Sequence, residues 1–311
     1  MLVLSRHEVR GLLDLDLLFD ALERAFVELS AGRTSVPPRT AAHVPGKGAL
    51  AAMPGYAGGI LEAKLVSVFP GNDAAGLPSH QALIALFDDE TGSPLALLDG
   101  TEITAVRTGA SSAVATRALA RPDARILAVL GAGVQGRSHL EAVTRVRAFR
   151  EVRIASRNPE HAETLAREVS ALAVGSFEDA VRGADVVCAC TDAGEPVVLG
   201  EWLAPGTHVT SVGLARDGPE LDADTVHSGL LVVESRIAFE PYPAGSHELQ
   251  GLDPDEATEL GEILGGTRKG RSSPEEITVY KSMGHAVEDA AAVGLVYRRA
   301  LELGTGTEIE V

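Results

Sequence analysis

The stretch GAGVQG, Gly131 to Gly136, decides the fold of one half of this chain. It directly follows the apolar run ARILAVL and directly precedes SHLEAVTRVRAF, whose apolar residues have helical spacing. A strand, a glycine-rich turn and a helix in this order are typical of a site for a dinucleotide pyrophosphate. The first glycine permits the tight turn, the second lets the backbone approach the phosphate, and the third lets the helix pack closely on the strand. We therefore predict a dinucleotide site rather than a purely structural turn, with contacts from Gly131, Ala132, Gly133, Val134, Gln135 and Gly136.

The residues after the next predicted strand, EVRIAS, indicate which dinucleotide is bound. An NAD site usually has an acidic residue about 20 positions past the last glycine, where it binds the ribose 2′-hydroxyl. This chain has Ser156, Arg157 and Asn158 there, and an arginine can pair with a 2′-phosphate through a contact worth roughly 1.5–3 kcal/mol. We predict NADP(H) as the preferred cofactor. In the alternative, NAD(H) is bound, Arg157 is a solvated surface residue and Glu160 takes the cofactor role.

Beyond Pro122, predicted strands and helices alternate. The predicted strands are ILAVLG, VRIAS, DVVCACT, HVTSVG and LLVVES, with HAETLAREVSALA and SFEDAVRGA as helices between them. Such alternation predicts a doubly wound parallel sheet with right-handed crossovers. Before Pro122 the pattern differs: the first 32 residues look helical, residues 34–99 carry short apolar runs between Gly, Pro and Asn turns, and a helix begins near Thr101.

We therefore predict an α/β protein of two domains. Residues 113–283 form a Rossmann NAD(P)-binding domain with a doubly wound parallel sheet. Residues 1–112 form an α+β domain for substrate binding and dimerisation. The last predicted helix, SMGHAVEDAAAVGLVYRRALELG, lies beyond the parallel unit, and we expect it to return to the first domain, so that residues 284–311 complete that domain.

Composition excludes several classes of function. The 311 residues carry a formal net charge of −17, which argues against a broad surface for nucleic acid or anionic membranes. No apolar run reaches membrane-spanning length, and the N-terminus lacks the order of a signal peptide, so we expect a cytoplasmic protein. Cys188 and Cys190 are the only cysteines and would point to opposite faces of a strand. HELQG, residues 247–251, lacks the second histidine of a zinc helix, and we expect no metal site.

Three isolated cations stand out in the predicted first domain: Arg39 after VPP, Lys64 inside LEAKLVSVF and Arg107 inside ITAVRTGASS. A lysine between apolar neighbours on a strand is costly to bury unless it is paired or binds an anion. Taken singly, each is more simply an edge-strand or surface charge. Together they have few acidic neighbours in the sequence besides Glu62 and Glu102. A carboxylate-binding pocket and three surface charges are equally compatible with these residues.

The chain resembles the ornithine cyclodeaminase and mu-crystallin family over nearly its whole length. The resemblance rests on PPR (37–39), AMPGY (52–56), AKLVSVFPGN (63–72), GLPSHQALIALFD, ITAVRTGASS, VLGAGVQG and ITVYKSMGHAVED. It implies a homodimer whose N-terminal domain, completed by the C-terminal helix, supplies substrate binding and dimer contacts. It also implies that Arg39 and Arg107 bind the substrate carboxylate, and that Lys64 donates or accepts a proton at the substrate nitrogen.

The resemblance further implies cofactor contacts at Thr108, Thr191, Val212, Gly213, Gly284 and His285. His285 begins the last predicted helix, where it is either a helix-start residue or a proton relay. Asp289 is interpreted as a helix-cap or pocket-lining acid, and His80 as a surface or pocket-side histidine.

Two departures from the family pattern bear on the reaction. The cyclodeaminases carry an Asp shortly after the strand that matches HVTSVG, and a Glu two residues before the Met-Pro pair. This chain has Ala215 and Ala51 at these positions, with Asp217 as the candidate substitute for the first. Losing two carboxylates removes the partners of a second, cationic substrate amine, which favours family members that reduce imines or interconvert 2-oxo and 2-amino acids.

The sequence therefore predicts an NAD(P)-dependent oxidoreductase that acts on a small imino, oxo or amino acid, with Lys64, Arg39, Arg107 and Asp217 as catalytic residues. Carboxylate binding by the two arginines would orient the C=N carbon for hydride transfer. Two alternatives remain. One is an ammonia lyase of the cyclodeaminase type, which recycles its NAD internally, and the other is a non-enzymatic, crystallin-like binding protein.

Overall fold

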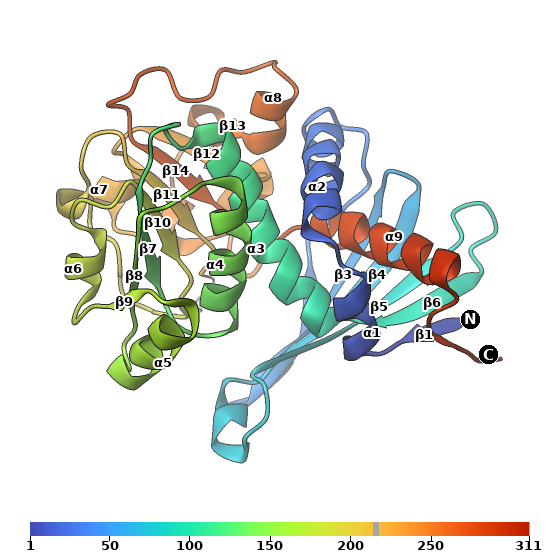
Figure 1. The fold of residues 1–311 in the computed structure, drawn as a ribbon. Helices are drawn as coiled ribbons and strands as arrows, with labels where there is room; N and C mark the ends of the chain where they lie inside the picture. Colours follow the sequence, from blue (N-terminus) through green and yellow to red (C-terminus); the bar gives the residue numbers. More distant parts are fainter. Residues whose placement is uncertain (214–217, 311) are drawn as a thin grey trace. The chain divides into compact units, whose positions relative to one another are not determined.

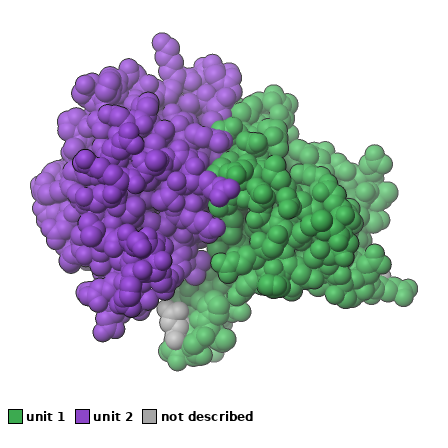
Figure 2. Space-filling view, in the orientation of Figure 1, with its two compact units in different colours: residues 1–107, 285–311 green, residues 108–284 purple. Residues whose placement is uncertain are grey.

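The computed structural model describes residues 1–213 and 218–310, which form two compact units. Unit 1 comprises residues 1–107 and 285–311, and unit 2 comprises residues 108–284 (Figure 2). The first unit boundary falls inside a single helix, α3 (Gly100–Leu119). The assignment of substrate binding to 1–112 with 284–311, and of dinucleotide binding to 113–283, stays a prediction.

Unit 1 is built on a seven-stranded sheet in the order β15-β1-β6-β5-β4-β3-β2. Strands β2 to β6 form an antiparallel meander, while β1 runs parallel to β6 and antiparallel to β15. The bounds are β1 Leu2–Leu4, β2 Thr40–Val44, β3 Gly48–Ala57, β4 Ile60–Val68, β5 His80–Phe87, β6 Pro94–Asp99 and β15 Thr307–Glu308. The prediction that the first 32 residues are all helical is wrong at Leu2–Leu4, because these residues pair with β6 and β15.

Helices α1 (Arg6–Leu12), α2 (Leu15–Ser30) and α9 (Ala286–Leu303) belong to unit 1. Ser5 and Glu8 form a capping box at the start of α1. Helix α9 packs on β3, β4 and α2, so the end of the chain covers one face of the sheet (Figure 1). It begins at Ala286 with His285 as its N-cap, which confirms the prediction that His285 lies at the start of the last helix.

Unit 2 contains an eight-stranded sheet in which every pairing is parallel, in the order β13-β12-β14-β11-β10-β7-β8-β9. This confirms the α/β fold class. The strands are β7 Ile126–Leu130, β8 Glu151–Ala155, β9 Leu172–Ala173, β10 Val186–Ala189, β11 His208–Ser211, β12 Leu230–Val233, β13 Thr258–Glu259 and β14 Thr278–Lys281. Strand β14 is absent from the predicted set, although it lies between β11 and β12.

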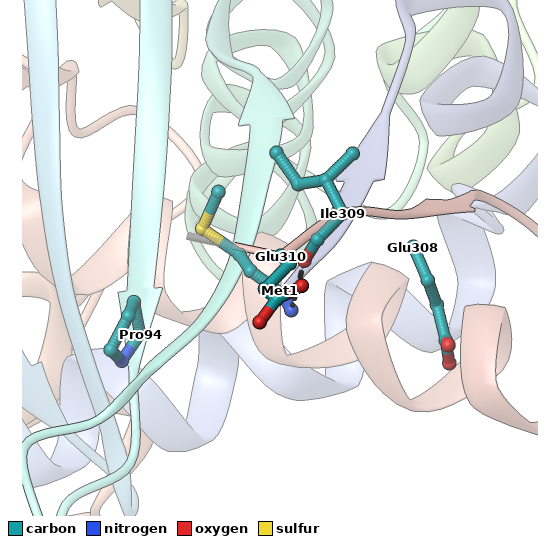
Figure 3. Close-up of a pocket in the computed structure, with 5 residues that line it drawn as sticks. All are labelled: Met1, Pro94, Glu308, Ile309 and Glu310. Atoms are coloured by element: carbon teal, nitrogen blue, oxygen red, sulfur yellow. Dashed lines mark hydrogen bonds between the residues drawn. The ribbon is translucent and has the colours of Figure 1, made fainter.

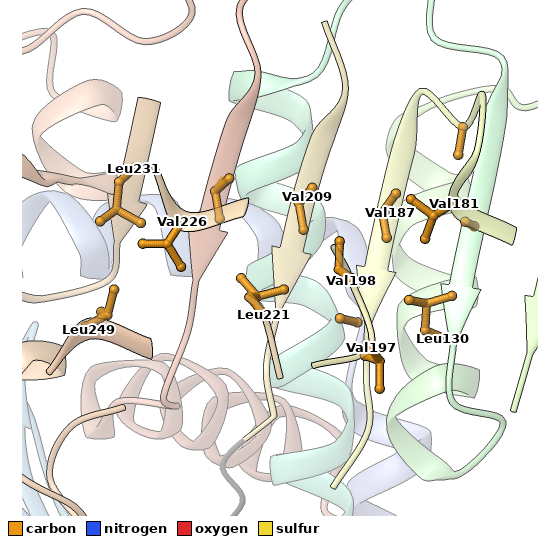
Figure 4. Packing of buried hydrophobic residues seen from close by; sticks show 14 of the residues in the cluster. Leu130, Val181, Val187, Val197, Val198, Val209, Leu221, Val226, Leu231 and Leu249 are labelled. Atoms are coloured by element: carbon orange, nitrogen blue, oxygen red, sulfur yellow. The ribbon is translucent and has the colours of Figure 1, made fainter. Parts of the chain in front are cut away.

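The helices of unit 2 are α4 Val134–Val146, α5 Pro159–Val169, α6 Phe177–Val181, α7 Ala223–Val226 and α8 Leu260–Leu264. Short 3-10 helices lie at Gly200–Trp202, Arg236–Phe239, His247–Leu249 and Pro254–Glu256, and another in unit 1 at Pro70–Ala75. Leu130, Val187 and Val209, from three neighbouring strands, lie in one buried apolar cluster with Val198 and Leu221 (Figure 4). Chain order reverses between β7 and β10, the point where doubly wound sheets bind dinucleotides.

None of the helices within the described ranges is both long enough and apolar enough to cross a membrane. A surface hollow lies where the two ends of the chain meet in unit 1, lined by Met1, Pro94 and Glu308–Glu310 (Figure 3). The amino group of Met1 donates a hydrogen bond to the carbonyl oxygen of Ile309, at 3.0 Å. None of the predicted site residues lines this hollow.

Candidate functional site

The turn between β7 and α4 requires glycine at two of its positions. Gly131 has φ +103°, in the region that favours glycine, and a Cβ on Gly136 would overlap the carbonyl oxygen of Gly131. Gly133 is the N-cap of α4, no side chain caps the helix, and a Cβ there would meet nothing within 4 Å. An uncapped helix start with open space before it suits a phosphate anion. The turn therefore fits the dinucleotide predicted for it.

The predicted 2′-phosphate site follows β8. Arg157 and Asp192 have side chains that are 83% and 89% exposed, with Nη2 of Arg157 4.0 Å from Oδ1 of Asp192. An ion pair between two side chains as exposed as these contributes little to stability. Asn158 caps α5, its side chain accepting from the backbone N–H of Glu160 at 3.0 Å. Glu160, the residue of the NAD alternative, is exposed in the first turn of α5.

The other predicted cofactor contacts are placed in three parts of the chain. Thr191 and Gly213 follow β10 and β11, and both bind the carboxylate of Glu220, a buried residue that the sequence analysis did not single out. Val212 donates its backbone N–H to the carbonyl of Ala189. Thr108, Gly284 and His285 are buried. Asp217 and Ala215 lie outside the described residues.

Lys64 and Arg107 are buried together in unit 1 and share one carboxylate. Nζ of Lys64 lies 2.6 Å from Oδ2 of Asp289, and Nε of Arg107 lies 3.0 Å from Oδ1 of the same residue. Nη1 of Arg107 lies 2.7 Å from Oε2 of Glu288. Lys64 is only 2% exposed, on a central strand of the sheet. The interpretation of Lys64 as an edge or surface charge is therefore wrong.

Helix α9 supplies both carboxylates from its first turn. The Glu288 carboxylate also accepts a hydrogen bond from the backbone N–H of His285, the N-cap of α9, at 3.1 Å. This bond fixes the Glu288 side chain. Asp289, interpreted from the sequence as a helix-cap or pocket-lining acid, lies in the first turn of α9 and pairs with Lys64 and Arg107. Its role as the shared partner of Lys64 and Arg107 could not be predicted, because it lies 225 residues from Lys64 in the chain.

The cluster shifts the ionisation of its members. Burial, together with the charges of Arg107 and Arg39, lowers the pKa of Lys64 although Asp289 opposes the shift. Burial and the Arg39 charge likewise lower the pKa of His285 to about 4, so the ring is neutral at pH 7. Burial alone would raise the pKa of Asp289, but Arg107 and Lys64 hold it below its usual value. Arg39 is half-buried and close enough to act on both Lys64 and His285.

Glu62 is the unexpected member of this region. It lies two residues before Lys64 on β4, hence on the same face of the sheet, and is 1% exposed. Neither carboxyl oxygen has a hydrogen-bond partner, and a Cβ on the neighbouring Gly55 would come within 3.1 Å of one of them. Burial and the charge of Asp289 raise the pKa of Glu62 to about 9. The residue is therefore a neutral acid at pH 7.

Several other expectations concern single residues. His80 is exposed and its ring contacts the hydroxyl of Ser79. Glu102 pairs with Arg10 rather than with the central cations. Cys188 and Cys190 are free thiols, and burial raises the pKa of Cys188 to about 12. Within residues 1–213 and 218–310, no cluster of His, Cys, Asp and Glu side chains could hold a metal ion.

Comparison with known proteins places the chain. The sequence profile of the ornithine cyclodeaminase/mu-crystallin family matches residues 1–304. The chain belongs to this family. The ketimine reductase mu-crystallin of Mus musculus is 41% identical over 309 residues, which cover 94% of this chain and 96% of the mouse protein.

Two solved structures of relatives match this chain over nearly its whole length. The Delta(1)-pyrroline-2-carboxylate reductase of Thermococcus litoralis, solved with NADH and L-proline, has a TM-score of 0.92 and 40% identity, covering 99% of this chain and 100% of its own. An archaeal alanine dehydrogenase dimer with bound NAD has a TM-score of 0.91 and 32% identity, covering 100% and 99%. Nicotinamide dinucleotides are thus bound by relatives that share the complete fold.

The buried acid Glu62 makes a testable contribution to stability. Its pKa is about 9 in the folded protein against an ordinary 4.5, so the folded state holds a proton that the unfolded chain loses above pH 4.5. The free energy of unfolding therefore falls as the pH rises from 4.5 to 9, and by pH 7 the loss is about 3 kcal/mol. We expect Glu62→Gln to remove this dependence, so that its melting temperature gains on the wild type between pH 5 and pH 8.

Differential scanning calorimetry across this range measures the effect, with Glu90→Gln in the exposed β5–β6 turn as the matched control. The control should follow the wild type at every pH. An unchanged pH dependence in Glu62→Gln would show that Glu62 is ionised in the folded protein.

Proposed function

We propose that this chain, an NAD(P)-dependent oxidoreductase of the ornithine cyclodeaminase/mu-crystallin family, reduces the C=N bond of a small 2-imino acid or interconverts 2-oxo and 2-amino acids. The proposal rests on one observation above all, the burial of a lysine and an arginine around a single carboxylate. Proteins rarely bury such cations without a reason, since removing charge from water is costly. Binding a substrate carboxylate and protonating a substrate nitrogen are functions that require such buried cations.

The charges of the cluster favour one carboxylate as ligand. Arg39, Lys64 and Arg107 are cations, Glu288 and Asp289 are carboxylates paired with them, and the acid Glu62 is neutral at pH 7. A cluster in which cations predominate suits the single negative charge of a 2-imino or 2-oxo monocarboxylate. Arg39 and Arg107 bind this carboxylate in the proposal and thereby orient the adjacent carbon.

Lys64 moves the proton in the proposed reaction. Its lowered pKa makes the ammonium a better acid than an exposed lysine, so it protonates the substrate nitrogen while the carbon is reduced, and it takes the proton back in the oxidative direction. Asp289 holds Nζ in place at 2.6 Å and stabilises the charged form between turnovers. The Gly131–Gly136 turn would hold the nicotinamide dinucleotide, whose chemistry would be the supply or acceptance of the hydride.

Replacing Lys64 tests this role. We expect Lys64→Met to lower kcat for reduction of a cyclic ketimine carboxylate by about 10²- to 10⁴-fold, the usual contribution of a positioned acid. The dissociation constant for NADPH should stay unchanged, because the dinucleotide turn is intact. Absorbance decay at 340 nm measures turnover, and fluorescence titration measures binding.

Lys47→Met is the matched control, since Lys47 is an exposed lysine in the same unit. The double variant Lys64→Met with Asp289→Asn separates chemistry from the instability that an unpaired Asp289 would cause. Near-normal turnover in either Lys64 variant would remove Lys64 from the mechanism.

The preference for NADP(H) over NAD(H) belongs to this proposal and is supported by Arg157. Its side chain is 83% exposed and only weakly engaged by Asp192, so it is available to a 2′-phosphate. We expect Arg157→Ala to weaken NADPH binding by about 10- to 100-fold while leaving NADH binding within twofold.

Arg150→Ala is the control for this selectivity, because Arg150 is exposed just before the opposite end of β8. Arg150→Ala should change the affinities for NADPH and NADH only by the small, unspecific effect of losing one positive surface charge. An unchanged ratio of NADPH to NADH affinity in Arg157→Ala would contradict the preference.

Assembly as a homodimer is the last part of the proposal. It is supported by the archaeal alanine dehydrogenase, described as a dimer, and by exposed leucines on one face of the unit 1 sheet. Leu65 and Leu83 are directly opposite each other on β4 and β5 and are 46% and 50% exposed, whereas their neighbours Lys64 and Ile84 are buried on the other face. A second copy of this chain would cover these apolar side chains.

We expect the double variant Leu65→Lys with Leu83→Lys to convert the dimer to a folded monomer, because four lysines would be buried at a two-fold interface. Sedimentation velocity measures the mass and circular dichroism the fold. Leu301→Lys, which alters a leucine on α9 that is 60% exposed, is the control and should leave the dimer intact. A wild type that sediments as a monomer at micromolar concentration would refute the assembly.

A further inference from the structure

A single buried carboxylate, that of Glu220, ties together the two chain segments that follow β10 and β11. Oε1 accepts hydrogen bonds from the backbone N–H and the hydroxyl of Thr191, both at 2.7 Å. Oε2 accepts from the hydroxyl of Ser211 at 2.7 Å and from the backbone N–H of Gly213 at 2.8 Å. Glu220 itself is 2% exposed. Both oxygens are thus fully engaged by neighbouring loops.

Lys281 and Glu248 complete this arrangement. Nζ of Lys281, at the end of β14, lies 3.0 Å from the Ser211 hydroxyl, 2.5 Å from the carbonyl of Gly213 and 3.2 Å from Oε1 of Glu248. The same oxygen of Glu248 accepts the backbone N–H of Glu220 at 2.7 Å. The side chains of Lys281 and Glu248 are 0% and 3% exposed. The ends of three neighbouring strands are therefore held by one buried ionic network.

The position of this network in the sheet connects it to the dinucleotide. Strands β10 and β11 lie directly beyond the reversal of chain order at β7, and parallel sheets bind dinucleotides at the carboxyl ends of strands there. Thr191 and Gly213 are predicted cofactor contacts in these segments. A Cβ on Gly213 would lie 2.6 Å from the Glu220 carboxylate, so the segment passes as close to Glu220 as a backbone can.

We propose that Glu220 is a positioning residue for the dinucleotide: it holds the Thr191 and Gly213 segments in their binding conformation before the cofactor arrives. Glu220 itself touches no cofactor in this proposal, which rests on the proposed function. A neutral amide cannot replace the carboxylate, because its NH₂ group would face donors from Thr191 or from Ser211 and Gly213. Loops that must be ordered on binding lower the affinity for the ligand.

The test compares Glu220→Gln with Glu201→Gln, an exposed carboxylate of the same unit. Hydrogen exchange in the cofactor-free protein should speed up at least about tenfold at the amides of Thr191 and Gly213, the change expected from one lost charge-assisted bond. The dissociation constants for NADPH and NADH should rise by at least the same factor. The KM for the cofactor should rise far more than kcat falls. The control should match the wild type in each measurement.

Ser211→Ala provides a milder variant if Glu220→Gln does not fold, since it removes one of the four bonds and should give smaller changes in the same direction. Faster exchange with unchanged dinucleotide affinity would overturn the positioning role while leaving the proposed function standing. Exchange as slow as in the wild type would also overturn it. A wild type that binds neither dinucleotide would refute the proposed function, and the positioning role with it.

Discussion

The ion-pair network beneath α9 is the constraint on which unit 1 depends. Lys64 and Arg107 are placed in the interior by β4 and α3, where burying a positive charge is costly unless a carboxylate pairs with it. Both partners, Glu288 and Asp289, come from the first turn of α9, at the far end of the chain. Removing α9 would leave two uncompensated buried cations, which typically costs several kcal/mol for each broken pair. The C-terminal helix must therefore return to the N-terminal sheet, and β15 then pairs with β1 beside the N-terminus.

The same constraint makes unit 1 suitable for acid–base chemistry. Opposite charges keep Asp289 ionised, burial makes Lys64 readier to release its proton, and Glu62 is a neutral acid at pH 7. In unit 2, the buried side chains of Glu220 and Lys281 likewise bind backbone that lies outside regular secondary structure, and so fix its position. In both units, buried charges stabilise one geometry of a polar region rather than adding to the apolar core.

The features that could be predicted from the sequence are local ones. The Gly131–Gly136 turn and the strand–helix alternation of unit 2 each depend on residues close together in the chain. Strand β14 was not predicted, because its four residues lie within the family motif ITVYKSMGHAVED, which continues into the last helix. The partners of Lys64 and Arg107 escaped prediction because they lie 225 and 182 residues away. An acidic pair at a helix start is compatible with an ordinary N-terminal turn, so only the fold shows what Glu288 and Asp289 neutralise.

The most direct measurement is the absorbance at 340 nm of NADPH mixed with the purified chain and a cyclic ketimine carboxylate, with ornithine in a parallel reaction assayed for ammonia. We expect stoichiometric oxidation of NADPH with the ketimine and no ammonia from ornithine, since this chain has Ala51 where the cyclodeaminases carry a glutamate. Ammonia release from ornithine without net change in NADPH, and no reaction with the ketimine, would contradict the assignment of net imine reduction.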